Sequence, residues 1–179
     1  MDEGLIERRI DGGEVFRGNW IRVQRDRIRL PDGKEATREF VRHPGACVII
    51  PELRPGVLLF ERQFRYPVGQ VFIELPAGKI DPEEDLLDCA RRELLEETGY
   101  TAGVWEHLGC MHNCIGYSDE RIEIFLARDM KPGQQQLDDG EFVELFEMSL
   151  KDAAAAVLDG RITDAKTITC LFWLQQKLG

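Results

Sequence analysis

The sequence predicts an α/β (α+β) fold, in which a small N-terminal antiparallel sheet precedes a central sheet that is buried on both faces. Two continuous apolar runs, 46–51 and 57–61, flank a turn at 54–56, which is typical of strands covered on both sides. An amphipathic helix is predicted over 83–98, and two further helices close the chain. The 179 residues suffice for one core with a small appended sheet.

The N-terminal region predicts a β-hairpin. Residues 20–30 alternate apolar and polar side chains over much of their length, 31–33 have turn chemistry, and 36–41 alternate again. We therefore divide the chain into a hairpin extension, 1–43, and a main domain, 44–179. Few residues remain to cover the apolar face of the hairpin, so we expect it to be a dimerisation element.

The remaining elements follow from periodicity and capping signals. Asp81 is the expected N-cap of the long helix, with Pro82 in its first position, Glu84 completing a capping box and Gly99 ending it. Gly160 is expected as a cap between the two last helices. We expect strands at 71–75, 104–111, 121–127 and 141–148, and closing helices at 150–158 and 164–178.

Composition excludes several classes of protein. Hydrophobic residues make up 43% and charged residues 31%, which is globular composition, and no apolar run is long enough to cross a bilayer. The formal net charge of -10 argues against nucleic acid and membrane surfaces as partners. The acidic N-terminus and five cysteines without a Cys-x-x-Cys pair predict a cytoplasmic protein with reduced thiols.

Three glutamates crowd the last turns of the long helix. Glu93 and Glu97 are a like-charge i,i+4 pair at the edge of the core-facing side, and Glu96 lies beside them. The negative end of the helix dipole makes this arrangement unfavourable, and Arg92 alone offsets only part of the repulsion. Mg²⁺ prefers oxygen ligands, so the cluster predicts a metal site; a crowded but solvated acidic face is the alternative.

The segment 78–100 resembles the Nudix box at every defining position. Gly78 is followed after five residues by Glu84 and after seven more by the run Arg92-Glu93-Leu94-Leu95-Glu96-Glu97-Thr98-Gly99-Tyr100. The resemblance implies a Nudix fold, which is a mixed sheet sandwiched between helices, with the box forming a loop, a helix and a loop. It also implies hydrolysis of a diphosphate that is linked to another moiety.

The same resemblance implies roles for individual residues. Mg²⁺, or Mn²⁺ in its place, would be bound by Glu93, Glu96, Glu97 and the carbonyl oxygen of Ala77, so that Glu93 and Glu97 would be catalytic. The residues with a structural role in the box would be Gly78, Glu84, Arg92 and Gly99.

Segments outside the box resemble the ADP-ribose pyrophosphatase branch, namely 63–65, 74–81, 116–121 and 160–167. A Mg²⁺-dependent pyrophosphatase acting on ADP-ribose, or on a related nucleoside diphosphate sugar, is the expectation, with AMP and ribose 5-phosphate as products. That branch is typically a homodimer. Before Gly116 this chain lacks the proline usual in the branch, which leaves a GDP-mannose or other sugar-nucleotide pyrophosphatase open. A non-catalytic Nudix ligand sensor is the alternative of another class.

Further site residues are expected outside the box. In the resembling branch a glutamate on a loop beyond the box is the general base, and Glu141 matches it best, with Asp139 and Glu120 in reserve. Arg38 and Arg65 are the candidate phosphate ligands, with ordinary surface salt bridges as the alternative. Glu120 is also a candidate substrate contact.

Overall fold

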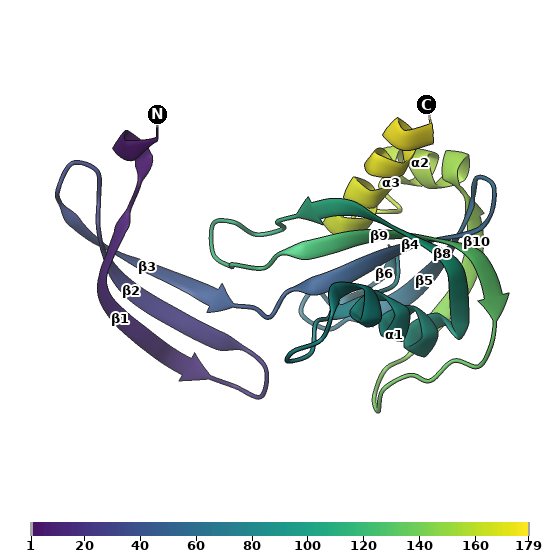
Figure 1. Ribbon diagram of the computed structural model, residues 1–179, viewed down its shortest axis with the longest axis horizontal. Helices are drawn as coiled ribbons and strands as arrows, with labels where there is room; N and C mark the ends of the chain where they lie inside the picture. Colours follow the sequence, from purple (N-terminus) through teal and green to yellow (C-terminus); the bar gives the residue numbers. More distant parts are fainter. Residues whose placement is uncertain (1, 179) are drawn as a thin grey trace. The chain divides into compact units, whose positions relative to one another are not determined.

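The computed structural model describes residues 2–178, which form two compact units. The first comprises the chain up to Pro44 together with Cys114–Arg121, and the second begins at Gly45 and resumes at Ile122 (Figure 1). The segment Cys114–Arg121 belongs to the first unit because it binds the end of a strand there. The Val41 N–H donates to the Tyr117 carbonyl at 2.8 Å, and Arg42 pairs with Asp119 at 2.7 Å.

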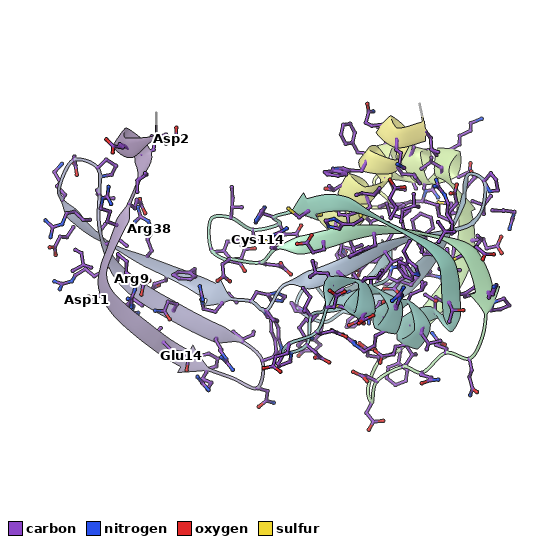
Figure 2. The ribbon with its side chains drawn as sticks, viewed as in Figure 1. Asp2, Arg9, Asp11, Glu14, Arg38 and Cys114 are labelled. Carbon is purple, nitrogen blue, oxygen red and sulfur yellow. The ribbon has the colours of Figure 1, made fainter. Side chains whose placement is uncertain are left out.

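The first unit is a three-stranded antiparallel sheet in the order β1-β2-β3. Its strands are β1 (Arg8–Arg17), β2 (Arg22–Arg29) and β3 (Glu35–Arg42), preceded by a 3₁₀ turn, η1 (Glu3–Leu5). The predicted hairpin is confirmed as β2 and β3. Strand β1, where Arg9, Asp11 and Glu14 are labelled in Figure 2, was not predicted, because Gly12 and Gly13 interrupt its alternation.

The second unit contains a seven-stranded mixed sheet. Strands β4 and β9 are parallel and all other pairs are antiparallel. Its strand order is β10 (Val143–Ser149), β5 (Val57–Arg65), β4 (Ala46–Arg54), β9 (Ile122–Pro132) and β8 (Tyr100–Met111), with β6 (Gln70–Glu74) paired to β5 and β7 (Ala77–Lys79) paired to β4. Every strand predicted for this region is present, and the short strand β7 is an addition.

Helices cover both faces of this sheet (Figure 1), which confirms the expected sandwich. Helix α1 (Leu86–Thr98) lies on one face, and α2 (Leu150–Leu158) and α3 (Ala165–Leu178) lie on the other. Successive side chains of β4 point to opposite faces, so Val48 and Ile50 pack in the core under α2 and α3, whereas Cys47 and Ile49 pack under α1. Both faces are buried, and this explains the continuous apolar run.

The N-terminus of α1 differs from the prediction. Glu83 has a positive φ of 64°, which no helical residue adopts, so the predicted start at Glu83 with an N-cap at Asp81 is wrong. The helix begins at Leu86, and the side chain of Asp85 caps it by accepting the Leu87 N–H at 2.9 Å. The capping-box contact does form, from the Asp81 N–H to the Glu84 carboxylate at 2.9 Å, but in a turn that precedes the helix.

The predicted helix ends agree with the structure. Gly99 adopts the left-handed conformation with φ 73°, and its N–H donates to the Leu95 carbonyl at 2.8 Å. Gly160 is left-handed as well, with φ 81°, directly after Asp159 at the end of α2. Within residues 2–178 no helix is long and apolar enough to cross a membrane.

Candidate active site

The chain between β6 and α1 joins the central sheet to the last turn of α1. Ala77 begins β7 and lies opposite Val48 of β4, which ties it to the middle of the sheet. Its N–H donates to the carboxylate of Glu97 at 2.8 Å. The Gln135 side chain donates to the backbone carbonyl of Glu97. Glu97 is therefore held at both its side chain and its backbone.

Gly78 provides the space for a second carboxylate. A Cβ atom built at Gly78 would lie 1.9 Å from the carboxylate carbon of Glu93. The Glu93 carboxylate therefore lies directly against the backbone of Gly78, at a separation that only glycine permits. The position of the Glu93 side chain therefore depends on having glycine at position 78.

Arg92 connects the loop of the box to its helix. Its Nε and Nη2 donate to the two oxygens of Glu84 at 2.8 and 2.9 Å, and Nη2 also donates to the Lys79 carbonyl at 3.0 Å. Its Nη1 donates to Glu93 at 2.7 Å and to Glu96 at 3.1 Å. The hydrogen bonds from Arg92 lower the pKa of Glu84 to about 2, and the bound carboxylates raise the pKa of Arg92.

Two of the box glutamates are buried, which opposes the ionisation of their carboxyl groups. Glu93 is 8% exposed and Glu97 is 4% exposed. Burial raises the pKa of each carboxyl, and the negative charge of Glu61 raises the pKa of Glu97 further. Arg92 lies against Glu93, whereas the side chain of Glu97 accepts from the neutral Ala77 amide. These hydrogen bonds thus give Glu93 a cationic partner and Glu97 a neutral one.

Glu61 is a buried carboxylate that the sequence did not single out. It lies on β5 with no solvent exposure, and neither carboxylate oxygen has a hydrogen-bond partner within the described part of the chain. Burial raises its pKa to about 8, and the charge of Glu74 adds to this effect. Glu61 ends the apolar run 57–61, so it resembled the polar end of a strand. Glu61 could have been recognised from the sequence as a charged residue within a strand that is predicted to be buried on both faces.

Arg65 is placed beside the carboxylates, but it is already paired. Its Nε and Nη2 donate to Glu74 at 2.7 and 2.8 Å, and Lys166 from α3 contacts both Glu74 and, at 3.1 Å, Asp164. Burial opposes ionisation of Glu74, but Arg65 and Lys166 outweigh it and lower its pKa. Sequence reasoning had not assigned Glu74, Lys166 or Asp164 to this network. The predicted contact of Arg65 with phosphate stays a prediction.

Glu141 lies within electrostatic range of the box. It precedes β10, whose Val143 lies opposite Gln63 of β5. Its negative charge raises the pKa of Glu61, Glu93 and Glu97. The register of two strands thus brings this loop glutamate toward carboxylates that come from α1.

The other predicted residues have different surroundings. Arg38 belongs to the first unit and forms a two-pronged ion pair with Glu7, including an Nε contact of 2.9 Å. Glu120, also in the first unit, lies 3.6 Å from the ring of His43. For both residues the predicted contact with substrate stays a prediction. Asp139 lies on the loop that precedes Glu141.

Two family models match the chain. The model of the nucleoside diphosphate sugar hydrolase N-terminal domain matches residues 7–41, and the NUDIX domain model matches residues 41–169. The chain belongs to the Nudix hydrolase family.

Curated relatives and a solved structure agree with this assignment. An ADP-ribose pyrophosphatase of Bacillus subtilis is 36% identical over 177 residues, which cover 98% of this chain and 96% of that protein. A GDP-mannose pyrophosphatase of Yersinia enterocolitica is 30% identical over 180 residues, covering 90% and 92%. The crystal structure of an ADP compounds hydrolase superposes with a TM-score of 0.87 at 22% identity, covering 97% and 95%, and confirms the Nudix fold.

Nudix hydrolases generally use a divalent metal, and the donors of this box suit one. The buried side chains that lack positive partners offer carboxylate oxygens, which hard divalent cations prefer. Among residues 2–178 no group of three or more His, Cys, Asp or Glu side chains is spaced to hold a metal ion. Arg92 instead occupies Glu93 and Glu96, so a cation would compete with its guanidinium for these two carboxylates.

Replacing Gly78 tests how the Nudix box positions Glu93. The Gly78→Ala methyl group would displace the Glu93 carboxylate, which is a flexible side-chain end, so the fold should survive. We expect Mn²⁺ affinity to fall about 10-fold in calorimetric titration, with little change in melting temperature. Gly13→Ala, where the methyl group meets open space, is the matched control. Unchanged Mn²⁺ affinity in Gly78→Ala would show that position 78 does not set the position of Glu93.

Proposed function

We propose that this Nudix hydrolase is a Mg²⁺-dependent pyrophosphatase that converts ADP-ribose to AMP and ribose 5-phosphate, or cleaves a closely related nucleoside diphosphate sugar. The intact box carries the proposal: one guanidinium, Arg92, contacts Glu84, Glu93 and Glu96 at once, and Glu97 lies at the same helix end. The named activity of the Bacillus subtilis relative supports the substrate class. The free cysteines support a reducing, cytoplasmic location.

Hydrolysis of a diphosphate requires an oriented water, a proton acceptor and neutralised phosphate oxygens. A bound Mg²⁺ would supply charge neutralisation and a more acidic water. Glu93, Glu96 and Glu97 would hold it together with the Ala77 carbonyl. Arg92 orients Glu93, and the Ala77 amide orients Glu97, so the ligands are held before substrate arrives.

Glu141 is the proposed general base, which would hold the attacking water and accept its proton. Its charge acts on Glu61, Glu93 and Glu97, which supports its nearness to the metal ligands. Gly140 directly before it has a positive φ of 90°, a conformation that favours glycine, and we propose that the loop bends here to bring Glu141 to the substrate. Arg65, Arg38 and Glu120 are the proposed substrate contacts, with Arg65 oriented by Glu74.

A GDP-mannose or other sugar-nucleotide pyrophosphatase is the second candidate. The GDP-mannose pyrophosphatase of Yersinia enterocolitica matches nearly the whole chain. The chain also reads Asn113-Cys114-Ile115 before Gly116, without the proline usual in the ADP-ribose branch. The same metal ligands would serve both substrates, since the diphosphate is common to them.

A substrate panel tests the proposed reaction. ADP-ribose, GDP-mannose, UDP-glucose, NADH and diadenosine polyphosphates are each assayed with Mg²⁺ and with chelator, and Glu97→Gln is the inactive control. We expect ADP-ribose to lead by about tenfold or more in kcat/KM, and chelator to abolish turnover. A lead of the same size for GDP-mannose selects the second candidate. No hydrolysis of any compound would contradict both and favour a ligand sensor.

Glu141→Gln tests the base. The amide cannot accept the proton, so we expect kcat to fall by ~100-fold or more while KM changes little. Asp139→Asn, on the same loop, is the matched control and should retain near-normal kcat. Steady-state kinetics at saturating Mg²⁺ measure both. Near-normal turnover of Glu141→Gln would remove Glu141 from this role, and a large loss in Asp139→Asn would transfer it to Asp139.

The N-terminal extension, 1–43, is proposed to hold a homodimer together. It exposes large apolar side chains, with Phe16 56% and Trp20 55% exposed. Light scattering at micromolar concentration should give about twice the chain mass of 20.5 kDa. The double substitution Phe16→Ser and Trp20→Ser should lower this measured mass. Phe172→Ser, which changes an exposed residue of α3, should leave the mass unchanged. A wild-type mass of one chain would reject the dimer.

A further inference from the structure

Strand β5 carries unpartnered oxygen atoms on one face. Within residues 2–178, the buried side-chain nitrogen and oxygen atoms that lack a hydrogen bond are both carboxylate oxygens of Glu61 and Oε1 of Gln63. Alternation along β5 sends Phe60 into the core under α2 and α3, so Glu61 and Gln63 point to the opposite face, which α1 covers. Unpartnered polar atoms in the interior are therefore confined to the face of the sheet where the box lies.

The cations near Glu61 are engaged elsewhere. Arg65 and Lys166 lower its pKa through their charge, but both donate their hydrogen bonds to Glu74. A buried carboxylate without hydrogen bonds is strongly unfavourable. The described side chains thus donate no hydrogen bond to either oxygen of the ionised Glu61.

Glu61 acts on the last turn of α1 through its charge. After burial, the charge of Glu61 is the largest influence on the carboxyl of Glu97, and Glu141 acts on both. These groups offer only carboxylate oxygens, so the ligand that suits them is a hard divalent cation rather than a soft metal. No hydrogen bond holds the Glu61 carboxylate in place, so it can bind such an ion without breaking a hydrogen bond.

We propose that Glu61 is a ligand of a divalent cation bound between β5 and the C-terminal turn of α1, next to Glu97. This inference rests on the proposed function, because the ion belongs to the same site. It adds a ligand from the central sheet to ligands that otherwise come from the box. Binding of the ion would then join β5 directly to α1 and satisfy the unpartnered carboxylate.

Calorimetric titration of metal-free protein with Mn²⁺ tests this inference without any assay of activity. Glu61→Gln removes the charge and keeps the shape, and we expect it to weaken Mn²⁺ binding about 10-fold or more, or to remove one bound ion. The rise in melting temperature on adding Mn²⁺ should shrink in the same variant. The matched control is Glu52→Gln, which changes a buried glutamate of β4 that pairs with Arg128 at 2.5 Å. It should bind Mn²⁺ like the wild type.

A parallel titration of Glu97→Gln separates this inference from the proposed function. If Glu97→Gln loses Mn²⁺ binding and Glu61→Gln binds like the wild type, Glu61 is not a ligand and the inference is overturned, while the metal site of the proposed function stands. If Mn²⁺ binding is absent from the wild type, or unchanged in Glu97→Gln, the metal site itself fails. Glu61→Met keeps the side-chain volume and removes both oxygens, so we expect it to weaken Mn²⁺ binding as well. It replaces Glu61→Gln in the titration if that variant does not fold.

Discussion

Burial of like-charged carboxylates between α1 and the central sheet is the constraint on which the second unit depends. Glu61, Glu74, Glu93 and Glu97 are all at most 8% exposed, and each must be neutralised or hydrogen-bonded to remain inside. The surrounding structure meets this need unequally. Glu74 receives Arg65 and Lys166, and Glu93 receives Arg92. Neither Glu97 nor Glu61 accepts a hydrogen bond from these cations, so their carboxyl oxygens are the ones that a divalent ion would satisfy.

The backbone of the box serves this arrangement directly. Because Gly78 has no side chain, the Glu93 carboxylate can lie against its backbone, and the Ala77 amide orients Glu97. Short strand β7 anchors both contacts by pairing with β4 in the middle of the sheet. A site built on a strand and a helix end, rather than on loops alone, keeps these carboxylates in place.

Local signals predicted most of the fold, and they failed where a long-range contact overrode them. The strands of the central sheet and both helix-ending glycines agree with the structure. The predicted start of α1 was wrong because Arg92 binds Glu84, eight residues before it, and holds Glu84 in a turn. Asp85 is then the residue that caps the helix. Strand β1 was missed because paired glycines break its alternation, although its cross-strand ion pairs, such as Arg27 with Asp11, favour it.

The sequence by itself determined the Nudix box, because its members lie within 23 positions and helical periodicity alone places Arg92, Glu93, Glu96 and Glu97 near one another. Tertiary structure alone decided what surrounds them. Glu61 lies more than thirty positions before Glu97, and Lys166 lies 92 positions after the Glu74 that it contacts. Strand register and helix packing bring such groups together, and no local pattern encodes those distances. Their charges, buried in one place, then set which carboxylates are satisfied and which still need a partner.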